Sequence, residues 1–351
     1  MSAVVQRFDH ASAGGAALRA FLGPLAELLA RPEITEVSIN QPGEAFVDAG
    51  GTIERLALPE LGYDHLQRLA SLIAYETHQV TDAERPLLSA WLPTGQRVQV
   101  VMPPACEAGT VVMSFRRQAE RQYTLEDYDA SGMFDAVAVV QDDALSPDDL
   151  ELIGLLGSGK LKDFLRHAVR YRKNIVVSGS TSSGKTTFLN TLLREVPADE
   201  RLLTIEDVRE LRTSVPNTAH LLASKGGQGV AKVTIQDLLE ACLRLRPDRI
   251  IMGELRGAEA SSFLHAVNSG HPGSLTSVHA DSPALAFERL ALMVMQGNAA
   301  LTREQILAYL RGVVDIVVQV RKCGAERKVS AIYFKHAHAA GSSTNKRSTS
   351  S

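Results

Sequence analysis

The sequence has few cysteines and no long apolar run, and both absences narrow the kind of protein it encodes. Its 351 residues include three cysteines, Cys106, Cys242 and Cys323, and no C-x-x-C pair. An odd number of widely spaced thiols argues against a disulfide framework and against a cysteine-built zinc site. It favours a reducing, cytosolic compartment. A membrane-spanning helix needs a run of about 18 apolar residues, and the sequence has none. We therefore expect any membrane contact to be peripheral.

The chain also lacks an excess of charge of either sign. It carries 37 Lys and Arg against 40 Asp and Glu, a formal net charge of −3. Nucleic-acid binding usually shows itself as a basic excess. We therefore expect no direct, sequence-specific nucleic-acid binding. Hydrophobic residues make up 45% of the chain, which at this length is enough for two hydrophobic cores.

The two halves of the chain show different secondary-structure patterns. Residues 1–134 combine short extended runs with a few helical patterns, which predicts a small α+β domain. Residues 135–149 are acidic and turn-rich and are interpreted as a linker. From 150 to 336, strands and helices alternate, which predicts an α/β domain built on a mostly parallel sheet covered on both faces. Residues 337–351 are rich in Ala, Gly, Ser and Thr and are expected to form a disordered tail.

The most informative segment of the chain is a glycine loop in its second half. Residues 179–186 match the phosphate-binding pattern G-x-x-x-x-G-K-[ST], after a β-branched run at 175–177 and before a helical pattern. The glycines let backbone N–H groups turn toward phosphate oxygens, and the helix N-terminus favours negative charge. Lys185 is expected to reach the β- and γ-phosphates and Thr186 to bind Mg²⁺. The predicted cofactors are therefore ATP and Mg²⁺. The predicted nucleotide-binding residues are Gly179, Ser180, Thr181, Ser182, Ser183, Gly184, Lys185, Thr186 and Thr187.

Two acidic residues follow apolar strand patterns and are candidates for catalysis. Glu206 ends the run 204–206, and its expected role is to orient or deprotonate the attacking water. Glu254 follows the run 249–252 in a Walker B-like arrangement, and its expected role is to hold Mg²⁺ through water. Carboxyl ends of parallel strands face the ligand crevice. The alternatives are a capping carboxylate for Glu206 and an ordinary exposed acid for Glu254.

Histidines and arginines complete the candidate set. His271 and His279 flank a glycine turn and a strand, and with no third ligand cluster apparent a metal site is a poor interpretation. A lone histidine is usually structural, but beside the neighbouring motifs a histidine near the γ-phosphate is the better interpretation. Arg97, Arg116 and Arg117 lie in the first half of the chain. Guanidinium groups suit the charge of a transferring phosphoryl group, while the alternative is a solvated surface.

Taken together, these segments resemble the secretion-ATPase superfamily, and most of all the VirB-type traffic ATPases of type IV secretion and conjugation systems. In that resemblance, 179–186 is the Walker A loop, 204–207 the Asp box, 253–254 Walker B, and 271–279 the His box. Segments 37–47 and 92–98 resemble the same proteins less specifically. A four-cysteine zinc insertion, usual in type II secretion and pilus-extension relatives, is missing. Pilus-retraction motors and tight-adherence secretion ATPases remain alternatives.

The resemblance implies a RecA-like P-loop motor domain behind a smaller α+β N-terminal domain, with ATP between them, assembled into homohexameric rings. It implies that Lys185 and Thr186 bind the phosphates and Mg²⁺ and that Glu206 assists hydrolysis. Glu254 would serve Mg²⁺, and His279 would sense the γ-phosphate. One or more of the three arginines of the first half would close over the nucleotide.

We therefore expect a hexameric, cytoplasmic ATPase, peripheral to the inner membrane, that powers substrate translocation or pilus assembly in a type IV secretion system. Its expected partners are copies of itself and other secretion components, including a coupling ATPase. Two alternatives stay open. One is the motor of a related pilus or type II secretion machine. The other is a nucleotide-gated scaffold with little turnover.

Overall fold

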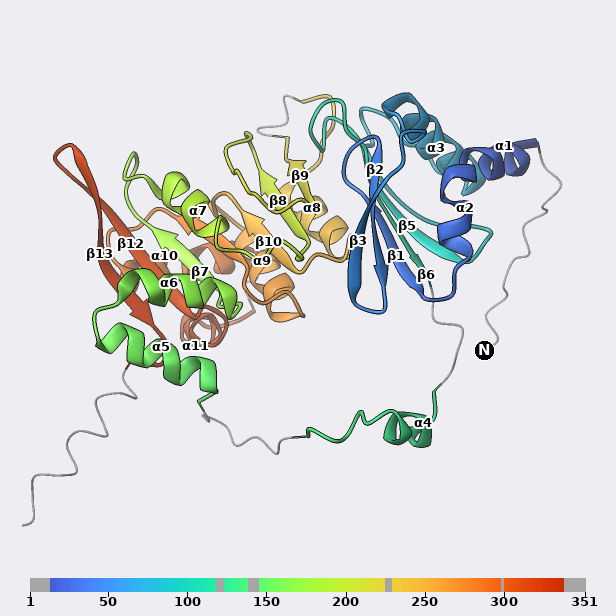
Figure 1. The fold of residues 1–351 in the computed structure, drawn as a ribbon. Coiled ribbons are helices and arrows are strands. Elements are labelled where there is room, and N and C mark those ends of the chain that lie inside the picture. Colours follow the sequence, from blue (N-terminus) through green and yellow to red (C-terminus); the bar gives the residue numbers. More distant parts are fainter. Residues whose placement is uncertain (1–12, 118–122, 138–144, 225–228, 298–299, 338–351) are drawn as a thin grey trace, which may run out of the picture.

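The structure is a computed structural model, and it describes residues 13–117, 123–137, 145–224, 229–297 and 300–337. Residues 138–144 of the predicted linker, and all but the first residue of the predicted tail at 337–351, lie outside the described residues. Two β-sheets organise the rest of the chain (Figure 1). The elements α1 to β6 are called the N-terminal domain below, and α5 to β13 the C-terminal domain.

The N-terminal domain is an antiparallel sheet with helices packed on one face. Six strands follow the order β3-β2-β1-β6-β5-β4. Leu66, Leu69 and Ile73 lie at helical spacing on α3 and are fully buried against the sheet. The strands are β1 (Ile34–Ile39), β2 (Glu44–Ala49), β3 (Thr52–Ala57), β4 (Leu87–Trp91), β5 (Gln96–Val101) and β6 (Val112–Arg117). The helices are α1 (Ala13–Phe21), α2 (Gly23–Ala30) and α3 (Tyr63–Glu76), and α4 (Leu125–Ala130) follows the sheet.

The C-terminal domain is a seven-stranded sheet in the order β13-β12-β7-β11-β10-β8-β9. Its neighbouring strands pair in parallel, apart from the antiparallel hairpin of β12 and β13. The strands are β7 (Ile175–Ser178), β8 (Leu202–Glu206), β9 (Thr218–Leu222), β10 (Arg249–Met252), β11 (Leu275–Val278), β12 (Ile316–Cys323) and β13 (Glu326–Phe334). The predicted α/β class, with a mostly parallel sheet, is confirmed.

Helices cover both faces of this second sheet because its strands are apolar on both sides. On β7, Val176 packs in one core while Ile175 and Val177 pack in the other. The first core holds α8 (Ile235–Cys242), α9 (Glu259–Asn268), α10 (Pro283–Gly297) and α11 (Arg303–Val313). The second holds α5 (Pro147–Gly157), α6 (Leu161–Arg170) and α7 (Lys185–Leu193). The phosphate-binding pattern thus joins a central strand to a helix that packs one face against the sheet.

Helix α5 begins inside the segment that the sequence analysis assigned to a linker. Ser146 accepts a hydrogen bond from the Asp149 backbone N–H, and the Asp149 carboxylate accepts one from the Ser146 backbone N–H. This is a capping box, and Pro147 at the first helical position strengthens it. The acidic, proline-containing run that suggested a linker is therefore a helix start.

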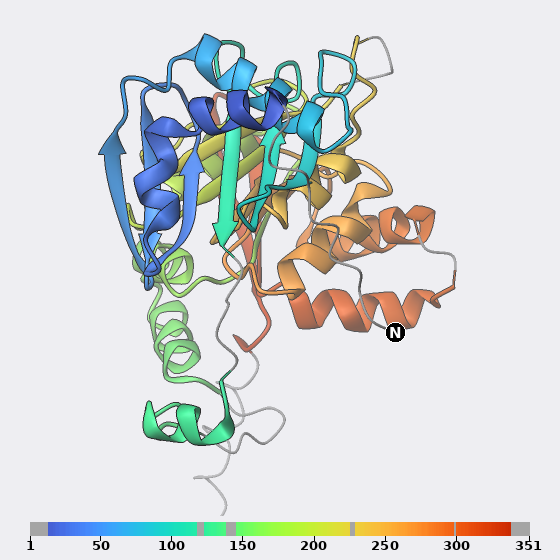
Figure 2. The same ribbon diagram turned by 90° about the vertical axis from the view of Figure 1, so that its right-hand side faces the viewer.

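The two domains meet at the β9 edge of the second sheet (Figure 1), and in the view of Figure 2 the N-terminal domain lies in front of that sheet. The loop between β5 and β6 lies against β9, where Ala105 O accepts a hydrogen bond from Leu222 N at 2.9 Å. Cys106 forms a β-bridge with Leu221. Nearby, the buried Asn40 side chain donates to Asn217 at 2.9 Å. None of the helices in the described residues has the length and apolarity needed to cross a membrane.

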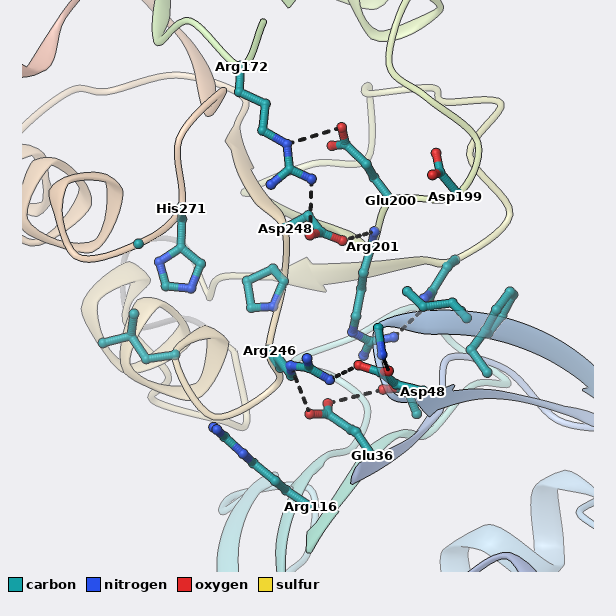
Figure 3. Close-up of a pocket in the computed structure, with 18 of the residues that line it drawn as sticks. Glu36, Asp48, Arg116, Arg172, Asp199, Glu200, Arg201, Arg246, Asp248 and His271 are labelled. Atoms are coloured by element: carbon teal, nitrogen blue, oxygen red, sulfur yellow. Dashed lines mark hydrogen bonds and ion pairs between the residues drawn. The ribbon is translucent and has the colours of Figure 1, made fainter. Parts of the chain in front are cut away.

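A charged cavity of about 570 Å³ lies between the two domains. Figure 3 shows the residues that line it. Arg246 of the C-terminal domain forms ion pairs there with Asp48 and Glu36 of the N-terminal domain. Burial raises the pKa of Glu36, against the opposing charge of Arg201. The residues that the C-terminal domain contributes to this cavity precede strands β7, β8, β10 and β11. The cavity therefore lies at the amino ends of these strands, and the phosphate loop lies at the opposite, carboxyl end.

Candidate functional site

The loop at 179–186 has the backbone that phosphate binding requires. Ser182 and Gly184 have φ values of +61° and +92°, so the chain turns sharply just before α7 begins at Lys185. A Cβ at Gly179 would lie 2.5 Å from Val320 O, which leaves room for glycine alone. Gly184 has no side chain to cap α7, so the first N–H groups of the helix are left for a ligand.

One buried hydroxyl also indicates that the loop fits a phosphate group. Ser183 Oγ is fully buried and has no hydrogen-bond partner among the described residues. A buried hydroxyl without a partner costs free energy that a bound acceptor would recover. The loop therefore fits the polyphosphate of ATP, by its backbone and by this side chain.

Lys185 faces the His box. Its Nζ lies 3.1 Å from Ser180 O and 3.2 Å from Nδ1 of His279, while Nε2 of His279 lies 2.9 Å from Glu254 Oε1. Burial lowers the pKa of Lys185, and the Glu254 carboxylate opposes this shift. Three residues from the Walker A, Walker B and His-box segments thus meet at the carboxyl ends of β7, β10 and β11.

Arg256 joins this cluster and was not singled out in the sequence analysis. Its guanidinium donates to Glu254 Oε2 at 3.0 Å and forms an ion pair with Asp207. Hydrogen bonding to Glu254 raises the pKa of Arg256, so it stays charged. Because β8 and β10 are neighbours in the sheet, the acids that follow them come within reach of one arginine.

Glu206 is the most enclosed carboxylate of the site. Its side chain is 3% exposed, and Oε1 accepts backbone hydrogen bonds from Glu210 at 2.8 Å and Leu211 at 2.7 Å. Oε2 has no hydrogen-bond partner within the described part of the chain. Burial raises the pKa of Glu206, while the two backbone bonds and Arg209 oppose the shift. A carboxylate with a raised pKa and one unoccupied oxygen suits a general base.

A cavity of about 790 Å³ opens at this edge of the sheet. Thr186, Glu206, Glu254 and Arg256 all line it. A hydroxyl and a carboxylate at one cavity wall are oxygen ligands of the kind that Mg²⁺ prefers. In the described residues, no group of three or more His, Cys, Asp and Glu side chains is arranged to hold a metal ion.

The remaining candidates lie elsewhere in this chain. The Arg97 guanidinium stacks 4.8 Å from the Trp91 ring centroid, and Arg117 donates to the Ala30 and Arg31 carbonyls. Arg116 lines the charged interdomain cavity. So does His271, whose Nδ1 lies 2.9 Å from Ala266 O. The structure thus brings Glu206, Glu254, Lys185 and His279 together and leaves these four residues apart from them.

Replacing Arg256 by Ala should impair catalysis with little change in stability. The variant leaves Asp207 and Glu254 without the cation between them. Glu254 then keeps only His279 of its two side-chain partners. We expect kcat to fall about tenfold, as for a lost charge-assisted hydrogen bond. The Arg256 side chain is 52% exposed, so the melting temperature should barely change. Arg303→Ala removes the similarly exposed Arg303–Glu288 pair and is the control. Equal loss of kcat in both variants would contradict the assignment.

Comparison with known proteins agrees with this geometry. The model of the "Type II/IV secretion system protein" family matches residues 20–350. The chain belongs to that family. It is 44% identical over 321 residues to the type IV secretion system protein VirB11 of Brucella suis, covering 89% of each protein. It is 40% identical to PtlH of Bordetella pertussis, over 88% of this chain and 92% of the relative.

The fold of the chain is also similar to that of a solved structure. It is the VirB11 ATPase of the Brucella suis type IV secretion system in complex with sulphate, with a TM-score of 0.86 and 42% sequence identity. The match covers 92% of this chain and 99% of that one. The predicted resemblance to VirB-type ATPases of type IV secretion is therefore confirmed.

Proposed function

We propose that this secretion ATPase hydrolyses ATP to ADP and phosphate with Mg²⁺, and that the reaction powers substrate translocation or pilus assembly in a type IV secretion system. The observation that carries the proposal is the meeting of Lys185, His279 and Glu254 beside a phosphate loop, with the buried Glu206 on the wall of the cavity that Glu254 also lines. Residues 179–187 would hold the phosphates. Thr186 and, through water, Glu254 would hold Mg²⁺.

The chain's own residues have distinct roles in this proposal. Bound Mg²⁺–ATP supplies the phosphoanhydride bond that water cleaves. Glu206 orients the water and takes its proton on Oε2, while the Glu210 and Leu211 amides hold Oε1 still. Lys185 neutralises negative charge, and His279 links it to Glu254, so that a change at the phosphates reaches the Walker B acid.

We further propose a homohexamer on the cytoplasmic side of the inner membrane, in contact with other secretion components that include a coupling ATPase. Each subunit would have an N-terminal domain at 1–134, a linker that starts at 135 and ends where helix α5 begins at Pro147, a motor domain from α5 to 336, and a tail at 337–351. The positions of Arg97, Arg116 and Arg117 support assembly, because in a single chain they lie apart from the phosphate loop. In a ring, a neighbouring subunit could supply these arginines.

Steady-state phosphate release across a range of protein concentrations tests both parts of this proposal. We expect activity per subunit to rise with concentration and then level off, because assembly completes the site. Sedimentation in the same buffer should place the rise where the ring forms. The absence of any activity above the Lys185→Ala background would sink the hydrolysis proposal. Constant activity from a monomer would remove the need for a ring.

A further inference from the structure

A chain of polar contacts connects the N-terminal domain to Glu206. Glu107 lies in the loop between β5 and β6, and its Oε1 accepts a hydrogen bond from Arg209 Nε at 3.0 Å. Arg209 lies after β8 in the C-terminal domain, and its NH1 is 3.8 Å from Glu206 Oε2. That distance is beyond hydrogen bonding but well within electrostatic reach. Arg209 thus stands between an acid of one domain and the candidate general base of the other.

His220 holds Arg209 from a third side. Its Nε2 lies 2.7 Å from Arg209 NH2, and its Nδ1 lies 2.7 Å from Thr204 Oγ1. Burial, with the Arg209 charge adding to it, lowers the pKa of His220 to about 3, so the ring is neutral. With its Nδ1–H toward Thr204, its Nε2 lone pair accepts from the guanidinium. A protonated His220 ring would repel Arg209, whereas the neutral ring accepts a hydrogen bond from it.

The position of Glu107 depends on how the domains dock. Two residues before it, Ala105 O accepts the Leu222 N–H of β9, and Cys106 bridges to Leu221. A shift of the N-terminal domain would break these contacts and withdraw the Glu107 carboxylate. Arg209 would then lose one of the two partners that hold it away from Glu206.

We propose that Arg209 is a positioning residue that makes hydrolysis depend on docking of the N-terminal domain. While Glu107 and His220 hold the guanidinium, Glu206 Oε2 has no hydrogen bond and is able to take a proton from water. When Glu107 withdraws, the guanidinium closes from the present ion-pair distance of 3.8 Å to a direct hydrogen bond on Oε2 and captures it. A captured carboxylate is a weaker base, so a subunit with an undocked N-terminal domain hydrolyses slowly. The inference rests on the proposed role of Glu206.

A double-mutant cycle of Glu107→Ala and Arg209→Gln tests this coupling, with kcat and KM for ATP as the first readout. We expect Glu107→Ala to lower kcat about tenfold, part of the contribution of a general base, with KM nearly unchanged. In the Arg209→Gln background, the same change should leave kcat within about twofold, because no guanidinium remains to close. Equal losses in both backgrounds would overturn the proposal.

Hydrogen exchange at the Glu210 and Leu211 amides is a second readout that needs no turnover. Both amides donate to Glu206 Oε1, so they report how firmly the carboxylate is held. We expect Glu107→Ala to slow their exchange, and to slow it only when Arg209 is present. If the wild type hydrolyses no ATP, the proposed function fails, and this exchange measurement alone decides the coupling. Unchanged exchange would refute it.

Ser89→Ala is the matched control for loss of an interdomain contact. Ser89 accepts a hydrogen bond from Arg244 across the domain boundary at 3.2 Å, and neither residue contacts Arg209 in the described structure. We expect kcat and the exchange of both amides to stay at wild-type values. A loss in Ser89→Ala as large as that in Glu107→Ala would mean that general loosening of the interface, and not Arg209, slows the reaction.

Discussion

Lys185→Ala is expected to abolish nearly all ATP hydrolysis. Lys185 is the first residue of α7, and its ammonium group lies beside the loop carbonyl of Ser180 and the ring of His279. In the proposed reaction it is a preorganised cation beside the phosphoryl group that is transferred. Loss of one such group typically costs about 10²–10³ in kcat. Phosphate release at saturating ATP, compared with the wild type, measures the loss.

The same variant should keep its fold. Lys185 is buried, and burial lowers its pKa, so its charge does not stabilise the empty protein strongly. We expect circular dichroism and the melting temperature to stay close to those of the wild type. Lys162→Ala, at an exposed lysine of α6, is the control and should retain full activity. Wild-type hydrolysis in Lys185→Ala would show that the phosphate loop is not the reaction site.

The local parts of the site could be predicted from sequence because each is carried by a short contiguous pattern. The glycine loop and Glu254 each follow a recognisable strand, and Glu206 is the last residue of one. Parallel pairing then brings their carboxyl ends to one edge. His279 joins them for the same reason, since it follows β11. Sheet order, which the alternation of elements only partly restricts, placed Lys185 and Glu254 within reach of one histidine.

The residues that connect these patterns were missed because their partners are distant in sequence. Arg256 lies two positions after Glu254, yet its link to Asp207 exists only because β8 and β10 are adjacent. Arg209 donates a hydrogen bond to Glu107, which lies 102 positions earlier in the sequence. No local pattern encodes such a pair. A clue was present at Arg256, since an arginine two positions after a Walker B acid has a carboxylate within reach.

Three strands are hard to predict from the sequence for a different reason. β13 is charged and mostly exposed, with the burial of a strand only at its end, so it has no apolar alternation to detect. It exists because β12 offers an edge to pair with. β9 has only five residues, with the polar His220 at its centre. β3 is exposed at most of its positions. The capping box at Ser146 could have been found from the sequence, because its spacing is a known helix start.

Glu206→Gln should separate ATP binding from hydrolysis. The amide keeps an oxygen to accept the Glu210 and Leu211 backbone bonds, so the loop keeps its shape. It has no basicity, so the proton of the attacking water has no acceptor. We expect kcat to fall by about 10²–10⁴, the usual contribution of a general base. ATP affinity, measured with a fluorescent analogue, should be retained.

Stability provides an independent check on Glu206→Gln. Burial raises the pKa of Glu206, so the native state disfavours its charge, and the penalty is present above the native pKa. It disappears below the ordinary glutamate pKa, where the residue is protonated in both states. The Gln variant should therefore be as stable as the wild type or more stable at neutral pH. The gain should vanish as the pH falls below about 4. A large loss of stability at neutral pH would contradict this electrostatic account.

The same variant also decides between a motor and a nucleotide-gated scaffold. A motor needs repeated release of phosphate, so a subunit that holds ATP without cleaving it should stop transfer in a cell-based secretion assay. A scaffold needs only the bound state, and it should work with the trapped nucleotide. Normal secretion by Glu206→Gln, with hydrolysis lost in the purified protein, would make turnover dispensable and favour the scaffold. Loss of both hydrolysis and secretion, with ring assembly intact, would indicate that ATP hydrolysis drives transport.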